Sequence, residues 1–195
     1  MTAVSFTPEE KLRVRNKTAI SLLWVGILGI VMMFAGLTSG YIVRQEEGNW
    51  LVFELPTMFS IGTVFMILSS GSMYWATRSV KKSNSIGVKW GLGVTLFLGL
   101  AFCISQYIAW GQLVDMGVYF TGKSANASGS FLYVISGMHL VHLFAGVLSL
   151  IYTFARALNN SYDAQNNLGI RMCALYWHFL DILWVYLFLF LTYIR

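Results

Sequence analysis

The sequence predicts an all-α integral membrane protein, a bundle of five transmembrane helices with a cytoplasmic N-terminus and a periplasmic C-terminus. Of its 195 residues, 57% are hydrophobic and 11% are charged. The apolar runs are longer than the core helices of soluble domains. The basic residues lie in short segments between these runs, so the net charge of +5 indicates membrane topology. No nucleic-acid partner is expected.

Five segments are long enough to cross a bilayer. A spanning helix needs about 20 mostly apolar residues, each rising about 1.5 Å. The expected spans cover residues about 19–43, 56–76, 90–115, 130–155 and 172–194. Pro56 suits the first turn of the second helix. We therefore expect a cytoplasmic N-terminal segment over residues 1–18 and one membrane domain over residues 19–195.

The orientation follows from the unequal distribution of Lys and Arg, which gather in short cytoplasmic segments of membrane proteins. One side of the predicted bundle holds most of the basic residues: Lys11, Arg13, Arg15, Lys17, Arg78, Lys81, Lys82, Lys89, Arg156 and Arg171. The other side holds Arg44, Lys123 and Arg195. The basic side, and with it the N-terminus, is therefore expected in the cytoplasm, and five crossings place the C-terminus outside.

Five polar side chains interrupt the last three apolar spans: Gln106, His139, His142, His178 and Asp181. A charged group at membrane depth costs about 2.5 to 3.5 kcal/mol, so such residues face protein and find partners. His139 and His142 are three residues apart and share one side of a helix. Counted from the cytoplasmic ends, Gln106 and His139 lie at similar depth, and His142 and Asp181 lie within about two turns of it. We therefore predict a structural cluster, joined by hydrogen bonds across the third, fourth and fifth helices.

Three chemical alternatives to this structural cluster remain open. A haem held between two axial ligands would need His178 together with His139 or His142, and these are poorly matched in depth. A proton relay would need a ladder of groups reaching both faces, whereas these groups cluster. A copper or non-haem iron site would need three or more convergent ligands, and the Glu residues lie outside or at the edges of the spans. We expect no metal, cofactor or catalytic residue in this chain.

Three spans carry motifs of a known family. The last span contains a dense pattern of aromatic and polar residues: Tyr176, Trp177, His178, Phe179, Asp181 and Trp184. The fourth contains Ser136, Gly137, His139 and His142, and the third contains Gly99, Phe102, Gln106 and Trp110. In this order and spacing they resemble subunit III of haem-copper terminal oxidases (cytochrome c oxidases). The resemblance covers nearly the whole chain and suits the five-helix bacterial form, which lacks the first two of seven helices.

The resemblance implies an accessory, non-catalytic subunit in the bacterial inner membrane. Haem and copper would belong to the catalytic subunit I and to subunit II, which would be partners together with small subunits. Membership of a respiratory supercomplex is left open. Subunit III of a quinol oxidase and the related accessory protein of nitric-oxide reductase are alternatives, and an independent b-type cytochrome is a more remote one.

The resemblance also implies bound phospholipid. Arg156 aligns with a basic residue that, in the family, meets a lipid phosphate. Three family acids are replaced, by Ile30, Ala109 and Arg171. With those acids gone, Arg156 and Arg171 are expected to favour an anionic headgroup.

Overall fold

The computed structural model describes residues 7–123, 125–160, 162 and 167–194, and their regular structure is five helices with no strand. The helices are α1 (Pro8–Glu46), α2 (Thr57–Lys81), α3 (Ser85–Asp115), α4 (Ala127–Leu158) and α5 (Leu168–Tyr193). Each is long and apolar enough to cross a membrane. The predicted fold class, an all-α bundle of five transmembrane helices, is therefore confirmed.

Helix α1 begins well before the predicted span at residue 19. Thr7 caps it: the Glu10 N–H donates to Thr7 Oγ1 at 3.3 Å, and the Thr7 N–H donates to Glu10 Oε2 at 2.8 Å. Pro8 occupies the first helical turn, where its missing N–H costs nothing. Residues 8–18 are therefore helical. Hydropathy indicates where a helix meets lipid, whereas capping decides where its backbone hydrogen bonds begin.

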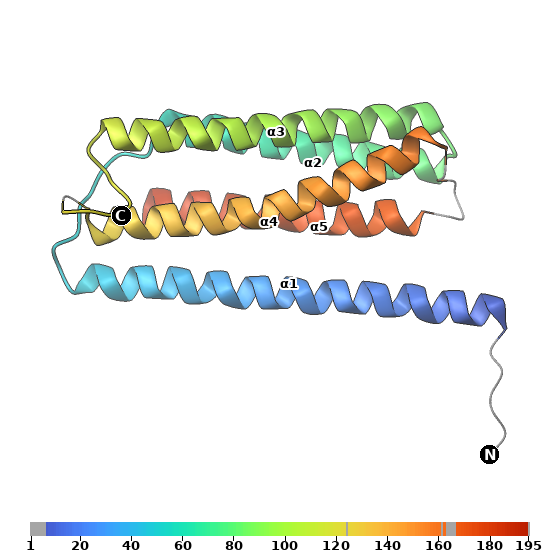
Figure 1. The fold of residues 1–195 in the computed structure, drawn as a ribbon, viewed down its shortest axis with the longest axis horizontal. Helices are drawn as coiled ribbons and strands as arrows, with labels where there is room; N and C mark the ends of the chain where they lie inside the picture. Colours follow the sequence, from blue (N-terminus) through green and yellow to red (C-terminus); the bar gives the residue numbers. More distant parts are fainter. Residues whose placement is uncertain (1–6, 124, 161, 163–166, 195) are drawn as a thin grey trace, which may run out of the picture.

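The helices run alternately up and down, and α1 lies at the outer edge of the bundle (Figure 1). α1 packs on α4 and α5, while α5 lies between α2 and α4. The ends at which α1, α3 and α5 begin, and α2 and α4 finish, carry the ten basic residues that the sequence assigns to the cytoplasm. We call this the basic end of the bundle.

Helices α2 and α3 form the closest pair. A Cβ added at Gly91 would lie 2.7 Å from the Cβ of Ala76 and 3.0 Å from its backbone. One turn nearer the basic end, a Cβ at Gly87 would lie 2.6 Å from Ser79 Oγ. Small residues on both helices thus let the two backbones approach closely. Such packing is usual in membranes, because the hydrophobic effect does not drive helices together in lipid and close contact has to do so.

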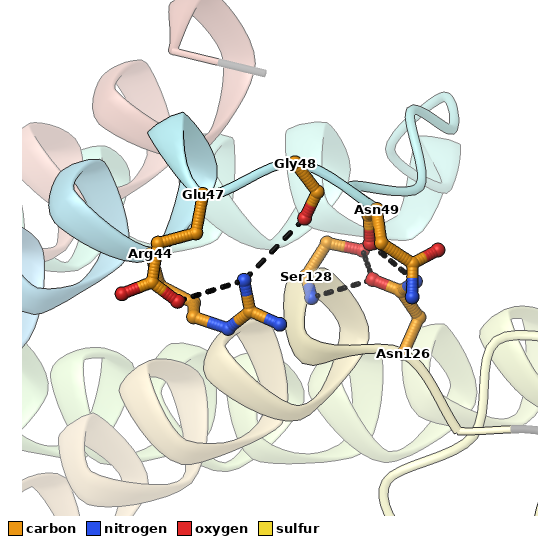
Figure 2. A network of polar contacts seen from close by, with 6 residues as sticks. All are labelled: Arg44, Glu47, Gly48, Asn49, Asn126 and Ser128. Atoms are coloured by element: carbon orange, nitrogen blue, oxygen red, sulfur yellow. Dashed lines mark hydrogen bonds and ion pairs between the residues drawn. The ribbon is translucent and has the colours of Figure 1, made fainter.

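At the opposite end, Asn126 joins the α1–α2 connection to the start of α4 (Figure 2). Its Oδ1 accepts from the Ser128 N–H at 3.0 Å and from the Leu51 N–H at 3.3 Å, and its Nδ2 donates to the Asn49 carbonyl at 2.9 Å. Asn49 has φ of 53°, a left-handed conformation that Asn tolerates well. One side chain therefore caps a helix and holds a turn distant in sequence.

Candidate functional site

The five predicted polar residues lie on α3, α4 and α5, and they differ in burial. Gln106 on α3 and His139 on α4 are fully buried, and Asp181 on α5 is 4% exposed. His142 on α4 and His178 on α5 are half-buried. The structure therefore places three of the five inside the core and two on its flanks.

The two half-buried histidines find partners outside the predicted cluster. His178 Nδ1 lies 2.6 Å from Ser70 Oγ on α2, in a hydrogen bond whose direction depends on the tautomer. His142 Nδ1 lies 2.7 Å from the Met138 carbonyl of its own helix. The Tyr176 hydroxyl of α5 donates to the His142 carbonyl at 3.1 Å. The His178 ring is thus held by α2, and the His142 ring by its own helix.

Gln106, His139 and Asp181 have buried side-chain nitrogen and oxygen atoms that make no hydrogen bond within the described part of the chain. The Gln106 amide lies on the Gly62 backbone, where an added Cβ would be 2.9 Å from its Nε2. The His139 ring packs against Trp184, with ring centroids 4.9 Å apart. The structure thus shows no direct hydrogen bond between members of the predicted cluster.

Tryptophans and hydroxyls supply the cross-helix hydrogen bonds that the sequence analysis missed. Trp177 Nε1 of α5 donates to Ser69 Oγ of α2 at 3.0 Å. Trp184 Nε1 donates to Thr63 Oγ1 of α2, also at 3.0 Å. The two tryptophans are seven residues apart, two helical turns, and so share one face of α5. The seven-residue spacing of the two tryptophans, together with the many hydroxyl residues of α2, was the sequence signal that could have predicted these bonds.

The hydroxyl residues also join other helix pairs. Ser72 of α2 and Thr95 of α3 share a hydrogen bond of 2.5 Å. Trp110 Nε1 of α3 donates to Ser136 Oγ of α4 at 3.1 Å. Ser69, Ser70 and Ser72 of α2 thus each have a hydrogen-bond partner on another helix. Within the described residues, no three His, Cys, Asp or Glu side chains converge as metal ligands would.

The two lipid-headgroup candidates occupy different surroundings at the basic end. The Arg156 guanidinium lies 6.0 Å from the ring centre of Tyr152 and 5.7 Å from that of Tyr162, in the α4–α5 connection. Burial raises the pKa of the Tyr162 phenol, and Arg156 offsets part of that rise, so the phenol is neutral near pH 7. The contact is therefore a cation–π interaction. Arg171 lines a separate pocket formed with α1 and α2.

Comparison with known proteins identifies the family. A family model described as cytochrome c oxidase subunit III matches residues 52–195. The chain belongs to the cytochrome c oxidase subunit III family. Membership confirms the resemblance to subunit III of haem-copper oxidases. The chain is therefore a non-catalytic, multi-pass membrane subunit that sits with other oxidase subunits. The matched region contains α2 to α5, and hence all five polar residues and both tryptophan bonds to α2.

Individual relatives are subunit 3 of two kinds of oxidase. Cytochrome c oxidase subunit 3 of Thermostichus vulcanus is 28% identical over 85% of this chain and 82% of its own length. That of Bacillus sp. (strain PS3) is 25% identical over 96% of this chain and 92% of its own. Subunit 3 of the cytochrome bo(3) ubiquinol oxidase of Pseudomonas aeruginosa is 30% identical over 85% of this chain and 79% of its own. Subunit III relatives thus occur in both cytochrome c and quinol oxidases.

Proposed function

We propose that this subunit III stabilises the catalytic, haem- and copper-bearing subunit I of a bacterial inner-membrane cytochrome c oxidase, with subunit II and small subunits as further partners. The single observation that carries this proposal is how the interior polar groups are used. Trp177 and Trp184 bind hydroxyls of α2, and His178 binds Ser70, so these side chains serve helix packing. Electron transfer and oxygen reduction then take place on the partner subunits, in aerobic respiration coupled to proton translocation.

The proposed orientation places the basic end in the cytoplasm and Tyr193 at the periplasmic side. It is supported by the ten basic residues at that end, against Arg44 and Lys123 among the described residues of the other. Residues 8–18 then form a helical extension of α1 into the cytoplasm, and residues 19–195 form the membrane domain. Phospholipid binding at Arg156 and Arg171 is part of the same proposal, because both are exposed cations at the level of the inner-leaflet headgroups.

The test is purification of the tagged chain from its host membrane in a mild detergent. We expect a large haem-bearing polypeptide to co-purify, with oxygen consumption supported by reduced cytochrome c. A preparation without such a polypeptide would contradict the proposal. A Soret band from the chain expressed alone, lost in a His139→Leu/His178→Leu variant, would favour the independent b-type cytochrome.

A quinol oxidase is the second candidate, favoured by the Pseudomonas aeruginosa relative, which is a subunit of a ubiquinol oxidase. The purified complex separates the two: oxygen consumption with ubiquinol but not with reduced cytochrome c would assign it to the quinol class. If the purified complex consumes nitric oxide in place of oxygen, this chain would be the accessory protein of a nitric-oxide reductase.

A further inference from the structure

Helix α1 extends beyond the other four helices at the basic end of the bundle (Figure 1). Ile20 of α1 lines a pocket together with Lys81, the last residue of α2, and Arg171, near the start of α5. Ile20 is therefore level with the ends of its neighbours. Residues 8–19 project past that level by about 18 Å, at about 1.5 Å per residue.

The projecting segment is a continuous part of α1. Thr7 and Glu10 form a capping box at its start, and Pro8 occupies the first turn. Membrane orientation requires only that Lys and Arg lie close to the cytoplasmic surface, in any backbone conformation. A capped helix does more, because it also fixes where each basic side chain lies around the helix axis.

One face of the projecting segment carries acids and bases in balance. Arg13 follows Glu9 by four residues and Glu10 by three, and Lys17 follows Arg13 by four. Side chains at these spacings are neighbours on a helix surface. Their charges therefore offset one another, and we call this the balanced face.

A second face carries positive charge without an acid. Lys11, Val14 and Arg15 are spaced three and four residues from Lys11 and share one side of the helix. All three are exposed, and Val14, 56% exposed, adds an apolar side chain beside the two cations. Within the described part of the chain the one ion pair is Arg44–Glu47 at the opposite end of the bundle, so it neutralises neither cation. We call these three residues the basic face.

The basic face points away from the bundle to which α1 belongs. The most buried side chains of α1, which mark its bundle side, are Ile27, Phe34, Thr38 and Tyr41. At about 100° per residue, from about 3.6 residues per turn, they lie roughly opposite Lys11 and Val14. The basic face is therefore presented to whatever lies beside α1 in the assembled complex.

Membrane headgroups account only for the part of this segment nearest the bundle. Ile20 is level with Arg171, which the proposed orientation places among the inner-leaflet headgroups. Lys11 lies about 14 Å further out along the helix. That distance exceeds the screening length of about 8 Å at physiological ionic strength. The negative charge that meets Lys11 therefore belongs to a protein surface.

We propose that the basic face of α1 docks onto an acidic surface on the cytoplasmic side of a neighbouring oxidase subunit. The proposal rests on the function and orientation proposed above, which supply the partner and its side of the membrane. Carboxylates of the partner flank Lys11 and Arg15, and an apolar side chain of the partner covers Val14. Complementary charge of this kind contributes more to specificity and association rate than to affinity. The docking surface therefore selects and orients the partner.

The experiment places the photoreactive residue p-benzoylphenylalanine at position 14 of the full chain, and the complex is irradiated in its host membrane before purification. We expect a cross-link to another oxidase subunit, mapped by mass spectrometry to a segment containing Asp or Glu. Lys11→Glu/Arg15→Glu should lower the cross-link yield at least about tenfold, because like charges across an interface repel. The matched control is Arg13→Glu/Lys17→Glu, which changes the net charge equally on the balanced face and should largely keep the yield.

A compensating change gives a second measurement. Replacing the cross-linked acid of the partner by Lys should restore the cross-link in the Lys11→Glu/Arg15→Glu variant, since the charges are then exchanged across the contact. No restoration would show that the acid does not face these two residues.

Other results would also overturn the docking surface. Cross-links to lipid alone would make the segment a membrane-surface element, and equal losses in the two charge variants would show that total charge matters and the face does not. A haem-bearing complex with no cross-link from position 14 rejects the docking surface alone. A preparation without a haem-bearing polypeptide rejects the proposed function, and the oxidase partner assigned to this face is rejected with it.

Discussion

The indole N–H of Trp184 donates to Thr63 Oγ1 at 3.0 Å across the contact between α5 and α2, and both residues are buried. Trp177 and Ser69 repeat the arrangement two turns nearer the basic end. An indole N–H in a hydrocarbon environment has no water to bind, so its partner must come from protein. The two bonds fix both the rotation of α5 and its height against α2.

We expect Trp184→Phe and Thr63→Val to destabilise the subunit non-additively. The shared bond should appear as a coupling of about 0.6 to 1.7 kcal/mol, the range found for hydrogen bonds between membrane helices. The measurement is a double-mutant cycle on unfolding of the purified chain in detergent. The same cycle on Trp184 with Ser136→Ala is the control, since Ser136 binds Trp110 instead. Additive effects in the first cycle would show that the bond contributes nothing net.

Gly91→Ala should loosen the α2–α3 pair, because the new Cβ would meet the Ala76 backbone at 3.0 Å. Overpacking of this kind costs about 1 to 3 kcal/mol. Gly111→Ala on the same helix is the control: nothing lies within 4 Å of its added Cβ, so the better helix propensity of Ala should leave stability unchanged or higher. Thermal unfolding followed by circular dichroism compares the two. Equal midpoints would contradict the close approach.

Gln106→Met should leave the subunit as stable or more stable by about 1 to 3 kcal/mol, because Met fills a similar volume and removes two buried polar atoms that have no partner. Gln106→Glu is the contrasting variant, since it puts an acid in the same unpartnered place. Both are measured as denaturation midpoints of the isolated chain. Strong destabilisation by Met would mean that Gln106 is hydrogen-bonded after all, and would revive the predicted network.

Asn126→Ala should cost about 1 to 2 kcal/mol, since it removes the N-cap of α4 together with both bonds to the 49–51 turn. Asn126→Asp keeps the oxygen acceptor but loses the donor to Asn49, and is expected to have the smaller effect. Amide hydrogen exchange reports the outcome locally: the Leu51 N–H should exchange faster in the Ala variant than in the Asp variant. Unchanged protection in both would contradict the role assigned to Asn126.

The sequence by itself determined the number and order of the membrane helices. This was possible because the bilayer is a solvent that acts on each segment separately: a helix must satisfy its own backbone and present enough apolar length wherever its neighbours lie. The motifs around His139, His142 and Asp181 likewise sufficed to identify the family, since they are local in sequence.

Only the tertiary structure decided which polar atoms meet. Similar depth suggested that Gln106, His139 and Asp181 would bind one another, whereas Trp177 and Trp184 bind hydroxyls 108 and 121 residues away, and the three expected partners make no such bond. Depth along a helix follows from counting residues, but the direction of a side chain depends on how that helix is rotated about its axis. That rotation is set by the combined packing of all the helices, as at Gly91 against Ala76.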